Sequence, residues 1–314
     1  MAADEGDSYY DSSGSDSEDA VGDDNGKKLY LRLCDENNVM PISQVVRYLD
    51  QGEIQLTRYG IGLRALVPLA KALEVNQSIV TLRLGDNGLN DAAVGLILRA
   101  LAINTRIQEV DLSMNQMGLA GANSIAELLL SKDSNLTSLN LSHNKLPDKG
   151  GAAIVDALYS NTTLTELNLS NNKLAEKTAI ALSNSLQVNN VLRHLNVSWN
   201  AFRSRGVAAI AEGLTPNLSI QSVDVSWTGV QDAGAEAIGT MLAGNQGLAE
   251  IIMSGNGITA IGAQQISQGI QGNDVLASVG LDQNDLRDEG GLAIKAALVE
   301  NRGSKFTVAT YMCR

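Results

Sequence analysis

Aliphatic and polar residues alternate along most of this chain in one pattern that returns at a fixed interval. The segment 164–174, LTELNLSNNKL, shows the pattern most clearly, with leucines separated by short polar stretches. The alternation Leu167-Asn168-Leu169 predicts a short strand with one buried face, and a longer segment with helical spacing follows it. A chain that repeats strand and helix in this order is expected to form a parallel sheet whose strands are connected by helical crossovers.

Asn172 lies at the position of this pattern that varies least in residue type. The equivalent positions are 28 residues apart, except for 29 between the third and fourth, and they are Tyr59, Asn87, Asn115, Asn144, Asn172, Asn200, Thr228, Asn256 and Asn284. A side-chain amide both donates and accepts hydrogen bonds, so we expect a buried asparagine column that binds loop backbone groups. Close packing near the helix starts is expected to require the recurring glycines Gly121, Gly150, Gly206, Gly234, Gly262 and Gly290.

Residues 1–26 differ in composition from the rest of the chain. They contain nine acidic residues, no basic residue and almost no aliphatic side chain, so they predict a disordered acidic tail. The formal net charge is −12, and the chain beyond this segment contributes only −3, from 26 acids and 23 bases. An acid lies three positions after each of Ser8, Ser13 and Ser15, which resembles the context favoured by casein-kinase-type enzymes. A kinase that acts on these serines and a purely solubilising tail are the two alternatives.

The segments that flank the repeats are expected to cover the ends of the array. In residues 27–52, a short apolar run from Tyr30 to Cys34 precedes a predicted helix at 41–49, which suits an N-terminal cap. Residues 304–314 contain a predicted strand at 306–311, which suits either a C-terminal cap or a truncated repeat. The expected organisation is a tail (1–26), a cap (27–52), nine repeats of about 28 residues (53–303) and the terminal segment (304–314).

Units of 28 residues with long helices resemble the ribonuclease-inhibitor-like class of leucine-rich repeats, and the resemblance covers about residues 51–301. It implies an α/β fold, a right-handed solenoid or horseshoe with a concave parallel sheet and convex helices. The segments YLRLC (30–34), PIS (41–43) and IQLTRYGIG (54–62) are also similar to the opening of the leucine-rich repeat-containing protein seventy-four group. This second resemblance implies no established activity.

Residues suited to catalysis or metal binding form no recognisable set in this sequence. His143 and His194 fall in different repeats without a triad motif, and Cys34 and Cys313 lie near opposite ends of the array. We therefore expect no catalytic residue, no metal and no cofactor. A mostly acidic tail and a nearly neutral body disfavour nucleic-acid binding. With no secretory signal and no apolar run of membrane length, the sequence predicts a cytoplasmic protein, with the nucleus or the ciliary axoneme as alternatives.

Side chains between the repeated leucines are expected to form rows across the concave face, because equivalent residues on neighbouring strands lie side by side. One row, in the middle of the strands, is rich in Asn and Asp and includes Asn168, Asn196 and Asp224. A second row, two residues further on, contains six consecutive serines, so we expect a small, polar and weakly acidic floor. The third row, directly before the asparagine column, reads Arg58, Asp86, Met114, His143, Asn171, Trp199, Trp227, Gly255 and Gln283.

Both tryptophans of the chain lie in this third row, one repeat apart. Paired tryptophans at an exposed rim are typical of binding hot spots, while mutual covering of the two indoles is an equally weighted alternative. We predict a monomeric, non-enzymatic interaction scaffold that binds a protein or peptide on its concave face. The predicted binding residues are Trp199, Trp227, His143, Asn171, Met114, Asp224, Asn196 and Asn168.

Two alternative functions follow from the family resemblance alone. Arg58, Arg64 and Arg83, near the N-terminal end of the array, are the residues that would support an activator of a small GTPase resembling the Ran activator. A structural component of a ciliary or axonemal assembly is the other alternative. Neither is carried by a motif in this sequence.

Overall fold

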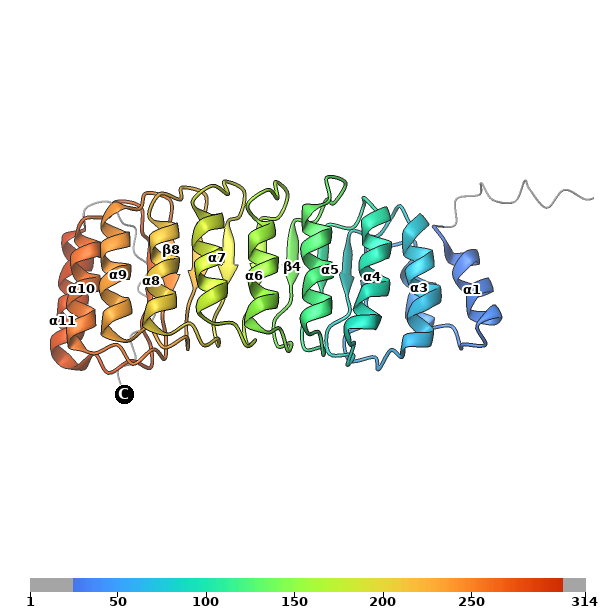
Figure 1. Cartoon of the computed structure of the whole chain (residues 1–314), viewed down its shortest axis with the longest axis horizontal. Coiled ribbons are helices and arrows are strands. Elements are labelled where there is room, and N and C mark those ends of the chain that lie inside the picture. Colours follow the sequence, from blue (N-terminus) through green and yellow to red (C-terminus); the bar gives the residue numbers. More distant parts are fainter. Residues whose placement is uncertain (1–24, 302–314) are drawn as a thin grey trace, which may run out of the picture.

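The computed structural model describes residues 25–301, which form a solenoid of alternating strands and helices (Figure 1). The strands are β1 (Glu53–Gln55), β2 (Thr81–Arg83), β3 (Glu109–Asp111), β4 (Ser138–Asn140), β5 (Glu166–Asn168), β6 (His194–Asn196), β7 (Ser222–Asp224), β8 (Glu250–Ile252) and β9 (Ser278–Gly280). The helices are α1 (Lys27–Glu36), α2 (Ser43–Tyr48), α3 (Leu63–Val75), α4 (Asp91–Ile103), α5 (Leu119–Leu130), α6 (Asp148–Ala157), α7 (Glu176–Leu186), α8 (Arg203–Leu214), α9 (Gln231–Gly244), α10 (Ala260–Gln271) and α11 (Arg287–Glu300).

Within the described residues, the strands form one nine-stranded parallel sheet in chain order from β1 to β9. Each residue pairs with its equivalent one unit later, as Glu166 does with His194 and Asn168 with Asn196. Figure 1 shows helices α3 to α11 side by side along the long axis, with the strands in a layer behind them. The predicted α/β solenoid with a parallel sheet is confirmed.

The core lies between the sheet and the helices and is built of similar aliphatic layers. The middle residue of each strand is buried, as Leu167 in β5 shows with 2% exposure. Leu169, two residues later, is also buried, with 0% exposure. Adjacent helices pack closely where the recurring glycines lie, because a Cβ on Gly150 would stand 2.8 Å from the Ala122 Cβ and one on Gly290 would stand 2.9 Å from the Ala263 Cβ. Close packing therefore explains these glycines, as the sequence predicts.

The asparagine column binds the loop backbones along one edge of the solenoid. Asn200 donates from Nδ2 to the carbonyl oxygens of Leu169 and Val197, each at 3.0 Å, and its Oδ1 accepts from the Leu174 amide at 3.1 Å. Because one bond reaches back to the preceding unit, each asparagine joins two units, as expected. Thr228 instead donates from Oγ1 to the Val225 carbonyl at 2.7 Å and to Asn256 Oδ1 at 3.4 Å, and it reaches no carbonyl of the preceding unit.

A second asparagine column runs along the opposite edge, where the helices end, and its role is not evident from the sequence pattern. Asn217 donates from Nδ2 to the Leu186 and Asn189 carbonyls at 2.6 and 2.9 Å, and its Oδ1 accepts from the Ile220 amide at 2.8 Å. The members of this column within the described residues are Asn76, Asn104, Asn161, Asn189, Asn217, Asn245, Asn273 and Asn301.

The 29-residue unit interrupts this second column. In its connection the buried residue is Ser134, whose Oγ has no hydrogen-bond partner among the described residues. Asn161, in the next unit, then donates to only one carbonyl of the preceding unit, that of Leu129. The extra residue lies in the connection from Ser131 to Asn135 and removes one junction of the column.

Aspartates near the helix starts join consecutive helices. Asp148, the first residue of α6, accepts hydrogen bonds from the Ala175 and Thr178 amides, each at 2.9 Å, at the start of α7. Burial alone would raise the pKa of this carboxyl, but bonds from Thr178, Ala175 and Lys177 outweigh it, and the pKa lies below its ordinary value. The pKa of Asp232 is lowered in the same way, by bonds from the start of α10.

The terminal elements differ in detail from the sequence expectations. The apolar run that begins at Tyr30 lies in α1, which Figure 1 places beside α3 at the N-terminal end of the array. The Ile42 amide donates to the Tyr30 hydroxyl at 3.0 Å and so joins α1 to the start of α2. The last helix, α11, begins at Arg287 and ends at Glu300. The predicted strand at 306–311 and the candidate phosphorylation sites in the tail lie outside the described residues.

Candidate functional site

The third row of the sequence analysis has an unusual backbone conformation in every unit. All nine residues have φ between 51° and 66°, in the left-handed region, and they are Arg58, Asp86, Met114, His143, Asn171, Trp199, Trp227, Gly255 and Gln283. This conformation suits glycine and, to a lesser extent, Asn and Asp, because a larger side chain crowds the backbone there. The turn between strand and helix therefore imposes a conformation that tryptophan, methionine and histidine rarely adopt.

The two tryptophans of this row stack on each other. Their ring centroids are 4.7 Å apart, and their planes are inclined by 18°. Trp199 nevertheless remains 52% exposed and Trp227 40% exposed. Trp227 also covers Gly255, since a Cβ at that position would overlap the indole. The rings therefore cover one another and still present a large aromatic surface.

Other members of the row are paired along the same edge. Asn171 donates from Nδ2 to the His143 Nδ1 at 2.9 Å, which corresponds to the tautomer with the proton on Nε2. Both side chains are exposed, and Met114 is 43% exposed in the preceding unit. The structure thus brings five of the eight predicted binding residues onto one continuous edge.

The remaining three predicted residues, Asn168, Asn196 and Asp224, lie at the ends of strands β5, β6 and β7 and are half-buried. Each accepts a hydrogen bond on Oδ1 from the backbone amide two residues later, at 3.0, 3.0 and 2.9 Å respectively. This Asx-type bond shapes the turn that leads to the residue with the left-handed backbone. These side chains therefore have a structural role in addition to any role in binding.

The expectation that serines form an exposed polar floor is wrong for the central units. Ser142, Ser170, Ser198 and Ser226 are only 4–8% exposed. They follow the last residue of the strand, where the Asx-type bond turns the chain inward, so their hydroxyls lie beneath the surface rather than on it. The second row thus belongs to the architecture of the turn.

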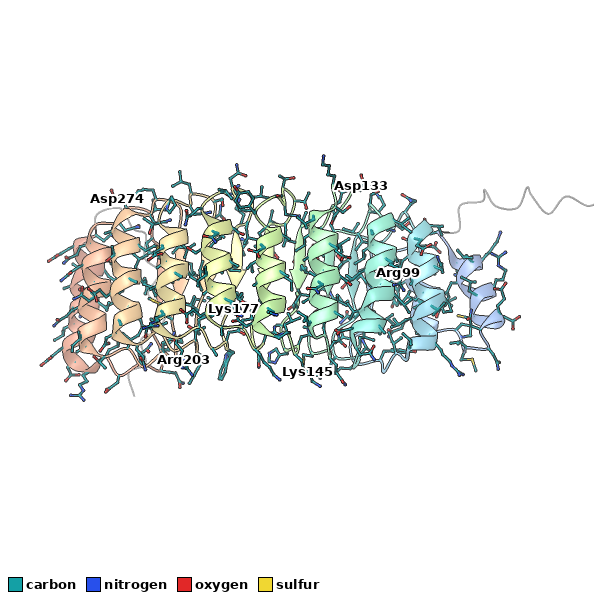
Figure 2. All side chains as sticks on the ribbon, viewed as in Figure 1. Arg99, Asp133, Lys145, Lys177, Arg203 and Asp274 are labelled. Atoms are coloured by element: carbon teal, nitrogen blue, oxygen red, sulfur yellow. The ribbon has the colours of Figure 1, made fainter. Side chains whose placement is uncertain are left out.

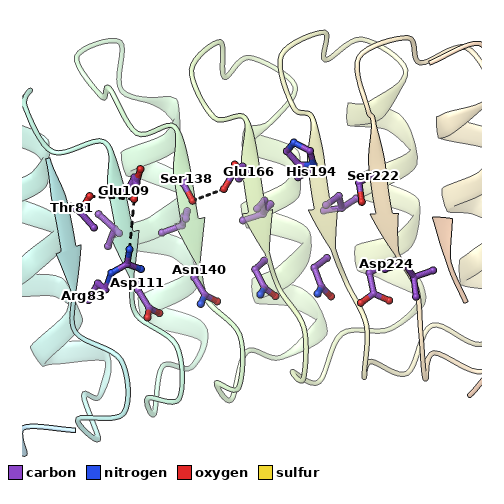
Figure 3. A pocket seen from close by; sticks show the side chains of 17 residues that line it. Thr81, Arg83, Glu109, Asp111, Ser138, Asn140, Glu166, His194, Ser222 and Asp224 are labelled. Atoms are coloured by element: carbon purple, nitrogen blue, oxygen red, sulfur yellow. Dashed lines mark hydrogen bonds and ion pairs between the residues drawn. The ribbon is translucent and has the colours of Figure 1, made fainter. Parts of the chain in front are cut away.

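The first residue of each strand forms a further row, next to the Asn/Asp row. Figure 3 shows this row beside the Asn/Asp row in a hollow on the concave face, where Thr81 pairs with Glu109 and Ser138 with Glu166. The hydroxyls donate to the carboxylates at 3.2 and 3.1 Å. His194 lies in the same row. Two-residue alternation, counted one step back from the strand leucine, would have identified these residues.

The candidate arginines are largely engaged in ion pairs. Arg58 contacts Asp86 with an N–O distance of 2.8 Å, and Arg83 contacts Glu53 at 2.6 Å. The hydrogen bond to Glu53 is the main reason why the pKa of Arg83 is raised further above its ordinary value. Arg64 is exposed in α3.

Among residues 25–301, no group of three or more His, Cys, Asp or Glu side chains lies close enough to hold a metal ion. Cys34 is buried, and burial raises the pKa of its thiol. No helix in this part of the chain combines the length and the apolar character needed to cross a membrane.

Comparison with protein families gives a match to the leucine-rich repeat model in five segments, residues 104–126, 132–155, 160–183, 188–211 and 217–239. Among curated proteins, the Tonsoku-like protein of Bos taurus is 36% identical over 95 residues, which are 30% of this chain and 7% of that protein. FERM domain-containing protein C of Dictyostelium discoideum is 29% identical over 98 residues, which are 31% of this chain and 6% of that protein. The chain thus spans less than a tenth of the length of these relatives.

The similar solved structures include two that differ in coverage. Leiomodin-1 actin-binding site 2 has a TM-score of 0.40 and 22% identity over 52% of this chain and 87% of its own. A TLR13–ssRNA13 complex has a TM-score of 0.44 and 14% identity over 80% of this chain and 31% of its own. Each matched segment spans one strand and the first part of the following helix, so the fold of this chain is an α/β leucine-rich-repeat solenoid.

Proposed function

We propose that this protein is a non-enzymatic scaffold that binds a protein partner along the edge of its concave face, centred on Trp199 and Trp227. The observation that carries the proposal is the stacked and exposed pair of tryptophans at two left-handed backbone positions. His143, Asn171 and Met114 extend the binding edge toward the N-terminal units. Asn168, Asn196 and Asp224 adjoin it on the concave face.

The architecture alone does not account for tryptophan at these two positions. A non-glycine residue in the left-handed region costs about 1–2 kcal/mol, and Gly255 shows that glycine fits the same turn one unit later. Stacking of two aromatic rings contributes about 0.5–1.5 kcal/mol, which roughly offsets the strain of one position and not of both. Two large rings held half-exposed by a rigid backbone are well suited to bury area in a partner with little loss of rotamer entropy.

The geometry favours this reading over the two alternatives. An arginine that stabilises phosphoryl transfer must be free to reach the nucleotide, whereas Arg58 and Arg83 are both engaged by carboxylates. A role in a ciliary or axonemal assembly and membership of the seventy-four group rest on resemblance alone, the latter on residues 30–62. No contact among residues 25–301 favours either one.

Quantitative affinity capture from native extract tests the proposal. Proteins that bind the unaltered chain are compared with those that bind Trp199→Ala/Trp227→Ala, in which both rings are lost. Tyr159→Ala/Leu218→Ala is the matched control, because these side chains are 62% and 70% exposed and lie on the opposite edge. We expect specific partners to be lost with the first variant and retained with the second. Equal capture by all three chains would contradict the proposal.

A further inference from the structure

Six exposed basic side chains gather on the edge that carries the tryptophans. They are Lys145, Lys149, Lys173, Lys177, Arg203 and Arg205. None of them lies within 4 Å of a carboxylate of residues 25–301, because the ion pairs in this part of the chain involve other bases. Figure 2 shows Lys145, Lys177 and Arg203 toward the same long edge of the molecule. Three consecutive units thus present unpaired positive charge in a chain whose net charge is −12.

The concentration of bases is confined to the fourth, fifth and sixth units. Lys145 and Lys173 directly follow the asparagine column, and Lys149, Lys177 and Arg205 lie five residues after it. The same two positions in the second, third, seventh and eighth units are uncharged, with residues Gly88, Ala92, Gln116, Ala120, Gly229, Ala233, Gly257 and Ile261. The architecture therefore does not require a base at either position.

Local acids neutralise this basic edge only in part. Asp148 lies within it, but both of its oxygens accept bonds from the start of α7. Glu176 is an exposed acid at the start of α7. The N-termini of α6, α7 and α8 all open onto this edge, and their helix dipoles add further positive potential. Trp199 adjoins the bases, since it lies in the same β6–α8 turn as Arg203.

The N-terminal segment of this chain matches the basic edge in charge and in aromatic content. Residues 1–26 contain nine acids and no base, and Tyr9-Tyr10 is flanked by Asp7 and Asp11. We propose that this acidic segment binds along the basic edge of its own chain, with Tyr9 and Tyr10 against Trp199 and the carboxylates against the bases. The segment would then occupy the partner-binding edge until a partner displaces it.

The length of the segment permits this contact. The Asn25 carbonyl accepts a hydrogen bond from Asn76 Nδ2 and so marks the starting point at the opposite edge of the first unit. Five strand spacings separate β1 from β6, or about 24 Å, and crossing from edge to edge adds about 18 Å, the length of a 12-residue helix. The straight path is about 30 Å, whereas the 15 residues from Tyr10 to Asn25 span up to about 50 Å when extended.

Attachment within one chain favours this occupant over a free acidic peptide, because a short tether gives effective concentrations in the millimolar range. Phosphate on Ser8, Ser13 or Ser15 would add about 1.5–2 negative charges at each site and strengthen the contact. High salt would weaken it, since exposed charges are screened within about 3 Å at 1 M ionic strength.

Zero-length carbodiimide cross-linking of the full-length protein, read by mass spectrometry, tests the proposal without any partner. The expected products join acids of residues 4–24 to Lys145, Lys149, Lys173 or Lys177. Lys132 is the matched control, because it is exposed on the opposite edge. An equal mixture of ¹⁵N-labelled and unlabelled chains separates bonds within one chain from bonds between chains. We expect at least a fivefold preference for the edge lysines over Lys132 and a loss of these products at 1 M salt.

Three results would overturn the proposal. The first is an equal yield of cross-links from residues 4–24 to Lys132 and to the edge lysines, and the second is cross-links that join only different chains. The third is the absence of any cross-link from residues 4–24 to the edge lysines in a protein whose basic edge still binds an added acidic peptide or single-stranded DNA. In Tyr9→Ala/Tyr10→Ala the edge products should fall at least twofold, and an unchanged yield would refute the aromatic contact. This proposal rests on the same tryptophans as the proposed function, but each of the two can be contradicted without the other. Cross-links require no partner, and partner loss in the tryptophan variant requires no tail contact.

Discussion

The two long edges of the solenoid are stabilised by the same kind of hydrogen-bonded asparagine column, but they present different surfaces. Each edge contains a column of buried asparagines that bind backbone groups of two successive units, as Asn200 does at one edge and Asn217 at the other. At the first edge, the residue before the asparagine position has a left-handed backbone in every unit, and most of its side chains are exposed. At the second edge, the asparagine closes a helix, as Asn104 does after α4.

This difference shows where the fold leaves the sequence free. The left-handed position holds residues that range from Gly255 to Trp227 without any change in strand register. A position that accepts both is not set by the backbone turn alone, so its residue type can serve recognition. The bases of the fourth to sixth units lie on this same edge, and the uncharged residues at the equivalent positions of the second, third, seventh and eighth units show the same freedom.

The loss of one asparagine from either column should have the largest effect on the free energy of unfolding. Asn200→Ala and Asn217→Ala should each lower the free energy of unfolding by about 3 kcal/mol, because several buried backbone groups lose their partners at about 1–3 kcal/mol each. Urea denaturation followed by circular dichroism measures both variants. Thr228→Asn supplies the amide that this unit lacks and should raise stability. If only one column proved sensitive, the edges would not share one stabilising device.

Removal of the Asp148 carboxylate should have the next largest effect. Asp148→Ala is expected to lower stability at pH 7 by about 1–2 kcal/mol, as loss of a helix N-cap does. The pKa of Asp148 is lowered in the folded state, so its contribution is present above the unfolded pKa of about 3.9 and is lost as the pH falls through the folded value. Urea titrations at pH 7 and pH 2.5 should show a larger difference between variant and parent at pH 7 than at pH 2.5. An equal difference at both pH values would show that charge has no part in it.

Ser134→Ala tests the interruption of the second column. The buried hydroxyl has no partner in the described part of the chain, and an unsatisfied buried group costs about 1–3 kcal/mol. Its removal should therefore raise the free energy of unfolding by about 1 kcal/mol, whereas Ser142→Ala, at a buried turn serine, should not. Urea midpoints of the two variants check this. A destabilised Ser134→Ala would mean that the hydroxyl is bound after all.

Trp199→Gly should change stability least. Glycine relieves the left-handed strain of about 1–2 kcal/mol, while loss of the stacked ring removes about 0.5–1.5 kcal/mol, so we expect a net change below about 1 kcal/mol. Thermal unfolding measures the balance. A loss of several kcal/mol would show that the indole pair is mainly a packing device and would weaken the contrast between the edges.

Sequence periodicity was sufficient for the features that repeat as single residues. It identified the parallel sheet, the column containing Asn200 and the close packing at Gly150, because each follows from spacing and residue type. It failed where the outcome depends on how the chain turns after the strand. The burial of Ser170 follows from the bond between the Asn168 side chain and the Ser170 amide, which spacing does not reveal.

The left-handed row and the second column were missed for a related reason. Asn171 and Gly255 in one row are residue types that favour positive φ. The same row also contains two tryptophans, a methionine and a histidine, which do not, so the row as a whole does not indicate this conformation. The asparagines that close the helices are visible in the sequence, yet their carbonyl partners lie about 28 residues earlier and are known only once the units are stacked. Hydrogen bonds between units are therefore the part that periodicity alone does not supply.

The most direct test of the central claim is the dissociation constant of the strongest specific partner for three chains. These are the unaltered protein, Trp199→Ala/Trp227→Ala and the opposite-edge control Tyr159→Ala/Leu218→Ala, measured by isothermal titration calorimetry. Loss of a tryptophan hot spot typically costs 2 kcal/mol or more, so the tryptophan variant should bind at least about 30-fold more weakly, with the control within about twofold. Unchanged affinity of the tryptophan variant, or an equal loss in the control, would contradict the assignment of recognition to the tryptophan edge.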